Sequence, residues 1–302
     1  MHIADILSRD SVTTSFEFFP PRNDAGWDSL FHVIADFEKL QPSFVSVTYG
    51  AAGSTRARTH ELVVRLKTQT KLDPIPHLTC ANHNRKDIEN ILTQYAQSGV
   101  SNILALRGDA QTAGSTASDF PFAADLVKCI QQFNQSAAHP DRRGFGIGVA
   151  GFPEGHPDTP NTLTQMDHLR AKVDAGADYI CSQLFFNNTA FFDWRERCEL
   201  AGIRIPVVAG IMPISNMASL KRMAELAGGT TFPAKLLRAV QRCGDDDAAV
   251  ERVGIHWATE QCLALLDSGV RGIHLYTLNK CTATQAIFQN LGLKSSAQLR
   301  SM

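Results

Sequence analysis

The amino-acid sequence predicts an α/β fold, a (β/α)8 TIM barrel with additional helices between strands 7 and 8. Short apolar runs alternate with amphipathic helical stretches along the 302 residues, an order typical of parallel sheets. Eight such runs occur, which fits a closed barrel better than an open sheet of five or six strands. Long flexible linkers and low-complexity segments are absent from the sequence. We therefore expect a single (β/α)8 catalytic domain over residues 1–302.

Glycine precedes four of the eight predicted strands, in the segments 97–109, 174–183, 200–210 and 267–279. A helical segment ends in a small residue and a glycine, and an apolar run ending in a polar residue follows. Glycine suits this place because it adopts the left-handed conformation that ends a helix and turns the chain into the next strand. The eight segments that contain the predicted strands are 12–19, 39–50, 71–80, 97–109, 145–152, 174–183, 200–210 and 267–279.

The helical stretches between these runs carry the apolar spacing of amphipathic helices. We expect them at 24–40, 57–70, 84–98, 119–135, 161–175, 188–201 and 215–227. The widest gap, 211–271, lies between the seventh and eighth strands. We expect it to hold additional helix around 232–242 and 247–267.

Composition and charge exclude several classes of protein. The net charge is −1, so no basic excess suggests nucleic acid or an anionic membrane as a partner. The N-terminal residues are too charged for a secretory signal, and the apolar stretch 205–214 is too short to span a bilayer. The 7 cysteines are scattered and form no C-x-x-C pair, as expected for free thiols in a reducing cytoplasm. We expect a cytoplasmic protein without a metal site.

The segment 146–151, GIGVAG, matches the G-x-G-x-x-G pattern of dinucleotide-binding folds. That mechanism needs a helix to begin at the third glycine, so that the helix N-terminus can hold the pyrophosphate. Pro153, Pro157 and Pro160 follow and prevent such a helix. We therefore interpret this segment as a glycine-rich barrel strand that leaves room in the interior.

The first predicted strand contains a carboxylate among phenyl rings, in the segment SFEFFPP at 15–21. Burying an unpaired carboxylate costs several kcal/mol or more, unless its pKa rises. The simple interpretation is that Glu17 turns to solvent or pairs with a basic residue. Strand side chains alternate, so Phe16 and Phe18 are expected to point away from Glu17.

The position of Glu17 favours a functional interpretation instead. In a (β/α)8 barrel the carboxyl ends of the strands form the active-site mouth. Polar residues follow most of the predicted strands at that end, and Glu17 belongs to this set. In chain order they are Glu17, Thr48, Thr79, Arg107 with Asp109, residues 152–156, Gln183, and residues 276–280.

Nine sequence blocks, in this order, resemble those of the methylenetetrahydrofolate reductase family. The first block, the RGD block and the last block are the most specific. The blocks are SFEFFPP (15–21), FVSVTYGA (44–51), PHLTC (76–80), LALRGD (104–109), FPEGHP (152–157), KVDAGAD (172–178), SQLFF (182–186), GIMPISN (210–216) and YTLNK (276–280). The resemblance covers practically the entire chain.

The resemblance implies a flavoprotein with FAD that reduces 5,10-methylenetetrahydrofolate to 5-methyltetrahydrofolate with NAD(P)H, in one-carbon metabolism. By resemblance, Glu17 is the general acid that protonates N10 of the folate and opens its five-membered ring to a 5-iminium cation. A flavin hydride then reduces that cation. Such an acid needs a raised pKa, which desolvation by bound flavin and pterin would supply. Asp109 would lie near both flavin and pterin and stabilise the cationic folate.

The resemblance also assigns the remaining contacts. Folate would contact Glu17 and Asp109, and Gln183 would bind both the folate and the nicotinamide. Residues 219, 223 and 280 would line the substrate pocket. The expected FAD contacts are Thr48, Tyr49, Ala51, His77, Arg107, Gly108, Asp109, Phe152, His156, His168 and Lys172. Lys172 would supply a charge to the phosphates, although a lone helix lysine is ordinarily a solvated surface residue.

Several positions depart from the family pattern. Phe152 replaces a tyrosine, Gln165 replaces an aspartate, and Ala171 lacks a basic side chain; these changes affect contacts to the FAD tail. Ser219 and Met223 replace glutamine and phenylalanine on the helix after strand seven, where substrates would stack. Lys280 replaces arginine, which keeps the charge near the folate tail but loses a bidentate contact.

Two alternative functions stay open from the sequence. In the first, FAD and folate are retained, but electrons come from another redox protein; the altered helix 215–227 is its support. In the second, the protein is a catalytically silent paralogue that binds folate or a partner, which the retention of Glu17, Asp109 and Gln183 argues against. The sequence does not separate NADH from NADPH. By resemblance we expect a homo-oligomer, and no inhibition by S-adenosylmethionine.

Overall fold

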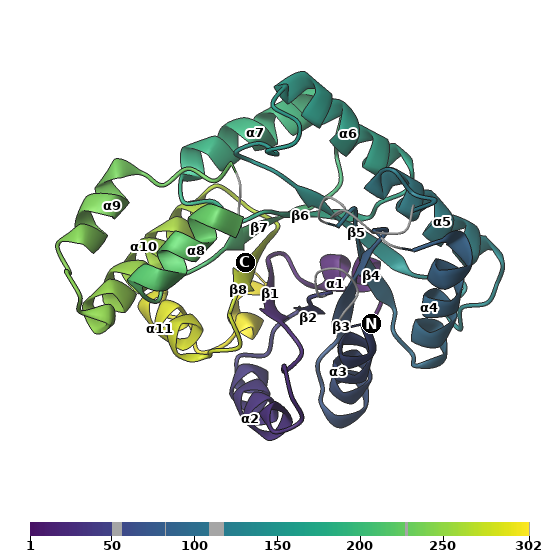
Figure 1. The fold of residues 1–302 in the computed structure, drawn as a ribbon, viewed down its shortest axis with the longest axis horizontal. Helices are drawn as coiled ribbons and strands as arrows, with labels where there is room; N and C mark the ends of the chain where they lie inside the picture. Colours follow the sequence, from purple (N-terminus) through teal and green to yellow (C-terminus); the bar gives the residue numbers. More distant parts are fainter. Residues whose placement is uncertain (50–55, 82, 109–117, 227–228, 302) are drawn as a thin grey trace.

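Eight parallel strands close into a barrel in sequence order, β1 to β8, with helices outside it (Figure 1). The computed structural model describes residues 1–49, 56–81, 83–108, 118–226 and 229–301. The predicted (β/α)8 barrel is confirmed. Its strands are β1 (Thr13–Phe18), β2 (Phe44–Val47), β3 (Pro74–Thr79), β4 (Asn102–Leu106), β5 (Gly146–Gly151), β6 (Tyr179–Ser182), β7 (Val207–Ile211) and β8 (Gly272–Tyr276).

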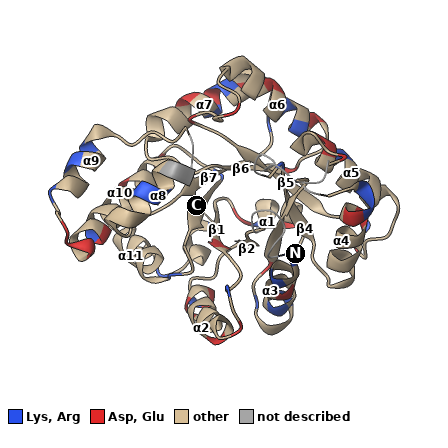
Figure 2. Ribbon diagram, viewed as in Figure 1, with Lys and Arg blue, Asp and Glu red and all other residues tan. Residues whose placement is uncertain are grey.

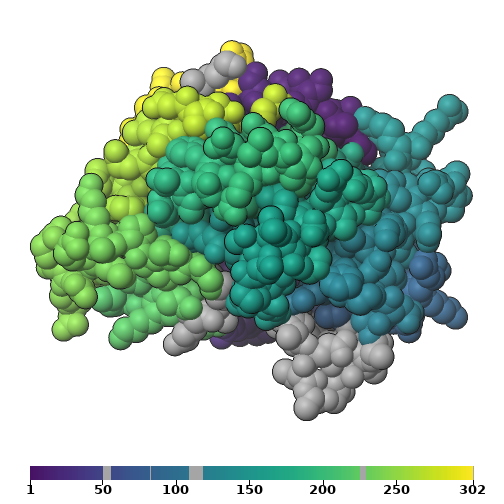
Figure 3. Space-filling view, turned by 90° about the horizontal axis from the view of Figure 1, so that it is seen from above, coloured from purple at the N-terminus to yellow at the C-terminus, as the bar shows by residue number. Residues whose placement is uncertain are grey.

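The helices lie where the sequence pattern predicts them, including the additional helices between β7 and β8. The barrel helices are α2 (Gly26–Lys39), α3 (Arg56–Gln69), α4 (Arg85–Gln97), α5 (Ala123–Gln135), α6 (Thr162–Asp174), α7 (Asn188–Leu200), α8 (Met217–Leu226) and α11 (Thr282–Asn290). The additional ones are α9 (Ala234–Gln241) and α10 (Asp247–Asp267). The light-green part of the chain that holds α9 projects at one edge of the molecule (Figure 3).

A helix that the sequence analysis missed, α1 (Ile3–Arg9), precedes the first strand and lies beside the strands within the ring of helices (Figure 1). Ile3 and Ile6 are fully buried in one cluster with inward side chains of the barrel, such as Phe44 and Tyr179. The backbone N–H of Ile3 donates to the side-chain oxygen of Asn102, at the beginning of β4. This helix therefore packs against the amino ends of the strands, away from the predicted mouth.

The side chains of β1 alternate as predicted. Phe16 and Phe18 are fully buried and pack outward on Phe37 of α2, with ring centroids 4.9 and 5.1 Å apart. Ser15 and Glu17 lie on the opposite, inner face, because successive strand residues point to opposite sides. The phenyl rings around Glu17 in the sequence therefore belong to the outer core.

The glycines of β5 make room inside the barrel, as predicted. A Cβ atom on Gly148 would lie 2.4 Å from the ring of Tyr179, and one on Gly146 would lie 2.5 Å from the side chain of Ile3. Both distances are shorter than real carbon contacts. The G-x-G-x-x-G pattern thus serves packing, with no helix beginning at its third glycine.

Helix α10 and the helices before it build a second, smaller core over the ends of β6 and β7. Its members are Leu184, Phe186, Met212, Ile214, Leu220, Met223, Leu236, Val240 and Val250. Trp257 of α10 donates its indole N–H to the carbonyl of Phe186 at 3.1 Å. The additional helices therefore support the segments that follow these strands.

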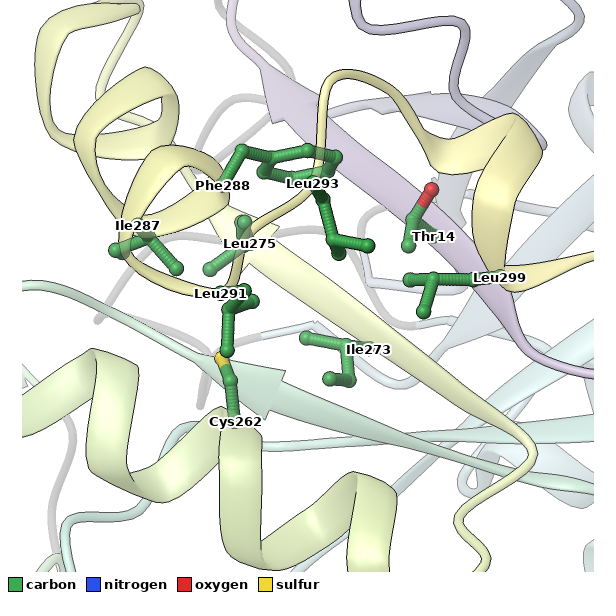
Figure 4. Close-up of a pocket in the computed structure, with 9 residues that line it drawn as sticks. All are labelled: Thr14, Cys262, Ile273, Leu275, Ile287, Phe288, Leu291, Leu293 and Leu299. Atoms are coloured by element: carbon green, nitrogen blue, oxygen red, sulfur yellow. The ribbon is translucent and has the colours of Figure 1, made fainter. Parts of the chain in front are cut away.

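A small apolar pocket lies behind β8, between that strand, α10, α11 and the C-terminal segment (Figure 4). It is lined by Thr14, Cys262, Ile273, Leu275, Ile287, Phe288, Leu291, Leu293 and Leu299. Thr14 is its one polar lining residue, and its hydroxyl is hydrogen-bonded to Ser296. This pocket lacks titratable carboxylates and histidines, so it offers no acid–base chemistry.

Charged side chains lie mainly on the outer helices, and the barrel strands carry few of them (Figure 2). Within the described part of the chain, no helix combines the length and apolar character needed to cross a bilayer. Glu17 is the exception, because its carboxyl group belongs to a strand and lies inside the barrel.

Candidate active site

Glu17 lies near the carboxyl end of β1, with its side chain 16% exposed. Thr48 donates its hydroxyl to Oε1 of Glu17 at 3.0 Å. Oε2 lies 3.5 Å from Nε2 of His77 and 3.5 Å from Nε2 of His274. Three different strand ends therefore converge on this carboxyl group, which is neither solvated nor unpaired.

The two imidazoles change the pKa of Glu17. Burial is the largest influence and raises this pKa, as the sequence argument expects. The charge of His77, a hydrogen bond from His274 and the hydroxyl of Thr48 act in the opposite direction, and the net result is a lowered pKa. This direction was not predicted from the sequence, because no histidine from β8 was expected beside Glu17.

Burial also lowers the pKa of His77, while Glu17 raises it and His274 lowers it. Among the described residues, Nε2 of His77 has no hydrogen-bond partner. A buried imidazole of this kind loses its proton more readily than an exposed one. A neutral His77 no longer favours ionised Glu17, so the protonation state of the carboxyl group depends on that of His77.

His274 is a residue that sequence reasoning did not identify. Its ring is 2% exposed, and Nδ1 lies 2.8 Å from the hydroxyl of Ser15. Tyr276 packs edge-on against it, with centroids 5.0 Å apart, and donates its hydroxyl to the carbonyl of Ser182. A signal was available in the sequence, because residues two apart in a strand share one face. His274 therefore lies on the same face as Tyr276, and Ser15 on the same face as Glu17.

A cationic corner, formed by Arg107, His156 and Lys172, lies at the ends of β4 and β5. Burial lowers the pKa of His156, and the positive charge of Arg107 lowers it further, while the carboxylate of Asp158 raises it. Arg107 donates to Asp158 at 2.6 Å, and its side chain is 38% exposed. Basic side chains gathered in one place favour binding of an anion.

Lys172 of α6 is buried, with 9% of its surface exposed. Its ammonium donates to the carbonyl of Ala150 at 2.5 Å and lies 5.8 Å from the ring centroid of Phe152. Burial lowers the pKa of Lys172 to about 8. The expectation for a lone helix lysine, a solvated surface residue, does not hold here, because the side chain points inward beside Leu169.

The remaining predicted FAD contacts occupy the same rim where the structure describes them. The hydroxyl of Tyr49 is hydrogen-bonded to Nε2 of His83 at 3.0 Å. Burial raises the pKa of Tyr49 to about 12. Phe152 packs edge-on against His156, with centroids 4.7 Å apart. Gly108 has a φ of 87°, and a Cβ there would lie 2.9 Å from Ala81. Ala51 and Asp109 lie outside the described residues.

His168 is placed differently from these rim residues. It is exposed on α6, and its ring lies 5.3 Å from that of Phe122. Gln165, one turn earlier, donates to the carbonyl of Thr159. This side chain closes the turn before α6.

The predicted substrate residues differ in their contacts and in their exposure. Gln183 follows β6, and its Oε1 accepts from the backbone N–H of Leu184 at 2.9 Å. Ser219 donates to the carbonyl of Asn216 at 2.7 Å within the N-terminal turn of α8. Met223 is 5% exposed within the second core, and Lys280 is exposed after β8.

Fold and site together define a class: a (β/α)8-barrel protein with a titratable carboxyl–imidazole cluster at its mouth and a cationic corner beside it. The chain belongs to the methylenetetrahydrofolate reductase family, whose model matches residues 2–292. The resemblance seen in the sequence is thus confirmed.

Curated relatives of two lengths match the chain. It is 37% identical over 314 residues to methylenetetrahydrofolate reductase (NADH) 1 of Arabidopsis thaliana, covering 98% of this chain and 51% of the relative. It is 34% identical over 283 residues to 5,10-methylenetetrahydrofolate reductase of Escherichia coli K12, covering 94% and 92%. The chain therefore spans about half the length of the plant relatives and most of the bacterial one.

A solved structure shares the fold at low sequence identity. It is a protein from Clostridium thermocellum that binds two copies of 5-methyl-5,6,7,8-tetrahydrofolic acid, with a TM-score of 0.64 and 15% identity. The match covers 97% of this chain and 98% of that one. At this identity the likeness shows the fold alone.

Proposed function

We propose that this protein reduces 5,10-methylenetetrahydrofolate to 5-methyltetrahydrofolate, with FAD as cofactor and NAD(P)H as electron source. The observation that carries the proposal is Glu17, a buried carboxyl group held by Thr48 and two imidazoles at the mouth of the barrel. Membership of the reductase family supports the reaction. The Clostridium thermocellum protein adds a folate ligand on the same fold.

The residues of the rim fit FAD. Its pyrophosphate is anionic, and the cationic corner offers Arg107, His156 and Lys172 to it. Gly108 allows the chain to turn closely at the end of β4. His77, whose Nε2 lies 3.5 Å from the carboxyl group of Glu17, adds a buried polar group at the mouth. When bound, FAD supplies hydride transfer between the two substrates.

Glu17 is proposed to donate a proton to N10 of the folate. The bond from the bridging carbon to N10 then breaks, and its electron pair takes the proton, leaving a 5-iminium cation. A pterin over the mouth excludes water from the carboxyl group. This further desolvation disfavours the ionised form and raises the pKa of Glu17. His77 and His274 lie against the carboxyl group and hold it in place. Asp109, outside the described residues, is proposed to stabilise the cation.

The nicotinamide and the folate are proposed to occupy one pocket in turn. A barrel of this kind has a single mouth at the carboxyl ends of its strands. Gln183 follows β6 at that end, and its amide can offer a donor and an acceptor to either substrate. Lys280, exposed after β8, is proposed to attract the carboxylates of the folate tail.

An anaerobic titration tests the proposed function. The purified holoprotein should lose its flavin absorbance on addition of NADH or NADPH and regain it with methylenetetrahydrofolate. NADH is the first choice, because the Arabidopsis relative is named for it. If NADH and NADPH did not reduce the flavin, but methylenetetrahydrofolate reoxidised a chemically reduced flavin, a redox protein would be favoured as the electron donor. A flavin that no folate reoxidises would refute the proposal.

A further inference from the structure

The segment after β8 is tied to the end of β1 by side chains. The strands pair through Glu17 and Tyr276, and the next residue, Thr277, donates its hydroxyl to the carbonyl of Glu17 at 2.6 Å. Two residues later, Asn279 donates Nδ2 to the carbonyl of Phe19 at 2.8 Å. The backbone N–H of Phe19 donates back to Oδ1 of Asn279 at 3.1 Å. The amide of Asn279 thus extends the β1–β8 pairing beyond both strands.

The backbone of this segment has an unusual conformation. Leu278 and Asn279 have φ angles of 51° and 56°, and the N–H of Lys280 donates to the carbonyl of Thr277 at 2.9 Å. These are features of a type I′ turn, in which glycine, asparagine and aspartate are the usual central residues. Leucine at the first central position is strained, and strain of this kind is held by surrounding contacts. The contacts present are those of Thr277 and Asn279.

The turn connects two residues with different proposed roles. Glu17 is held at its carbonyl by Thr277, and Thr277 also accepts from the N–H of Asn279 at 3.2 Å. Lys280 directly follows Asn279, so the left-handed turn sets where its side chain leaves the rim. A change in the Asn279 bridge therefore alters the position of the proton donor relative to the cation for the folate tail.

We propose that Asn279 is a positioning residue that fixes Glu17 and Lys280 in one geometry for the folate. This inference rests on the proposed function, and it adds a residue whose side-chain amide is bonded to the backbone of Phe19. It predicts a defect confined to the half-reaction with folate. The half-reaction with nicotinamide needs no proton from Glu17 and should stay intact.

Asn279→Gly is the test variant, because glycine keeps the left-handed backbone while removing the amide. The structure offers a matched control. Asn134 donates Nδ2 to the carbonyl of Phe145 at 3.0 Å and accepts from its N–H at 2.8 Å, at the amino end of β5. Asn134→Ala thus removes the same two-way bridge far from the mouth.

Stopped-flow absorbance should measure each half-reaction in holoprotein of the wild type and both variants. In Asn279→Gly, flavin reoxidation at saturating folate should slow by about 10- to 100-fold, since small misplacements reduce rates to this degree. The folate concentration for half-saturation should also rise, because Lys280 is displaced. Flavin reduction by NADH should stay within about twofold of the wild type. Asn134→Ala should leave both half-reactions unchanged while lowering the melting temperature.

A second variant keeps the inference testable if Asn279→Gly does not fold. Thr277→Val preserves shape but removes the hydroxyl between Glu17 and Asn279, and it should give the same selective defect. Normal folate reoxidation in either folded variant would overturn the inference, as would equal loss of both half-reactions. A wild type that folate never reoxidises would instead refute the proposed function.

Discussion

Replacing Glu17 by glutamine separates the proposed chemistry from the packing of the site. The amide has nearly the same shape, and its oxygen can still accept from Thr48, which lies 3.0 Å from Oε1. It cannot deliver a proton to N10. Folate reduction should therefore fall by about 10² to 10⁴-fold, the usual loss of a general acid. Flavin reduction by the nicotinamide should survive.

The pH dependence of stability gives an independent measurement on the same variant. The pKa of Glu17 is lowered in the folded protein, so its ionised form stabilises the fold above the unfolded-state pKa of about 4.5. That contribution is lost as pH falls through the folded-state pKa. Glu17→Gln removes it, so denaturant midpoints of the variant should decline less steeply below about pH 4.5 than those of the wild type.

Two results would refute this reasoning. If both half-reactions fell together in Glu17→Gln, the residue would be structural rather than a proton donor. If the acid limb of the stability curve were the same in both proteins, His77 and His274 would not stabilise the ionised carboxyl group in the folded state. Thr48→Val is the control, because it removes one hydrogen bond and leaves the titrating group.

The remaining predictions concern three other positions. Lys172→Met should weaken FAD binding, and wild-type affinity should fall as pH rises through about 8, where Lys172 loses its charge; pH-independent affinity in fluorescence titrations would contradict this. Gln183→Ala should slow both half-reactions, and the wild type should give parallel double-reciprocal lines; intersecting lines would argue against one shared pocket. Gly148→Ala should destabilise the protein by about 1–3 kcal/mol or more, because its Cβ meets Tyr179 at 2.4 Å; an unchanged urea midpoint would contradict the packing argument.

The barrel was predictable because local sequence signals mark where its helices end and its strands begin. A helix that ends at glycine and turns into an apolar run is visible within about ten residues, as at Gly99 and Gly269, which both have positive φ. Helix α1 was not predicted because it has only 7 residues, of which Ile3 and Ile6 are buried. Two apolar positions are too few to show the spacing of an amphipathic helix. Its partners come from distant strands, which no local pattern reports.

The site was predictable only in part, for a related reason. The strand-end position of Glu17 was visible in the sequence, and its burial follows from it. The approach of His77 and His274 to Glu17 was not visible, because it requires the barrel to close. Closure brings the inner faces of β3 and β8 toward that of β1. The inward turn of Lys172 likewise depends on the packing of α6 against β5. Asn279 lay within a recognised block, but its bridge to Phe19 requires the register of β8 on β1.

The packing of α1 has a consequence for biosynthesis. This helix leaves the ribosome before any strand, yet the cluster that buries Ile3 and Ile6 includes Leu104, Tyr179 and Val208. Contacts across such sequence separations form slowly, because long loops must close first. Helix α1 therefore completes its docking only after β7, which holds Val208, has been translated. Until then part of the cluster that buries Ile3 and Ile6 is missing, so the helix keeps apolar surface exposed during synthesis.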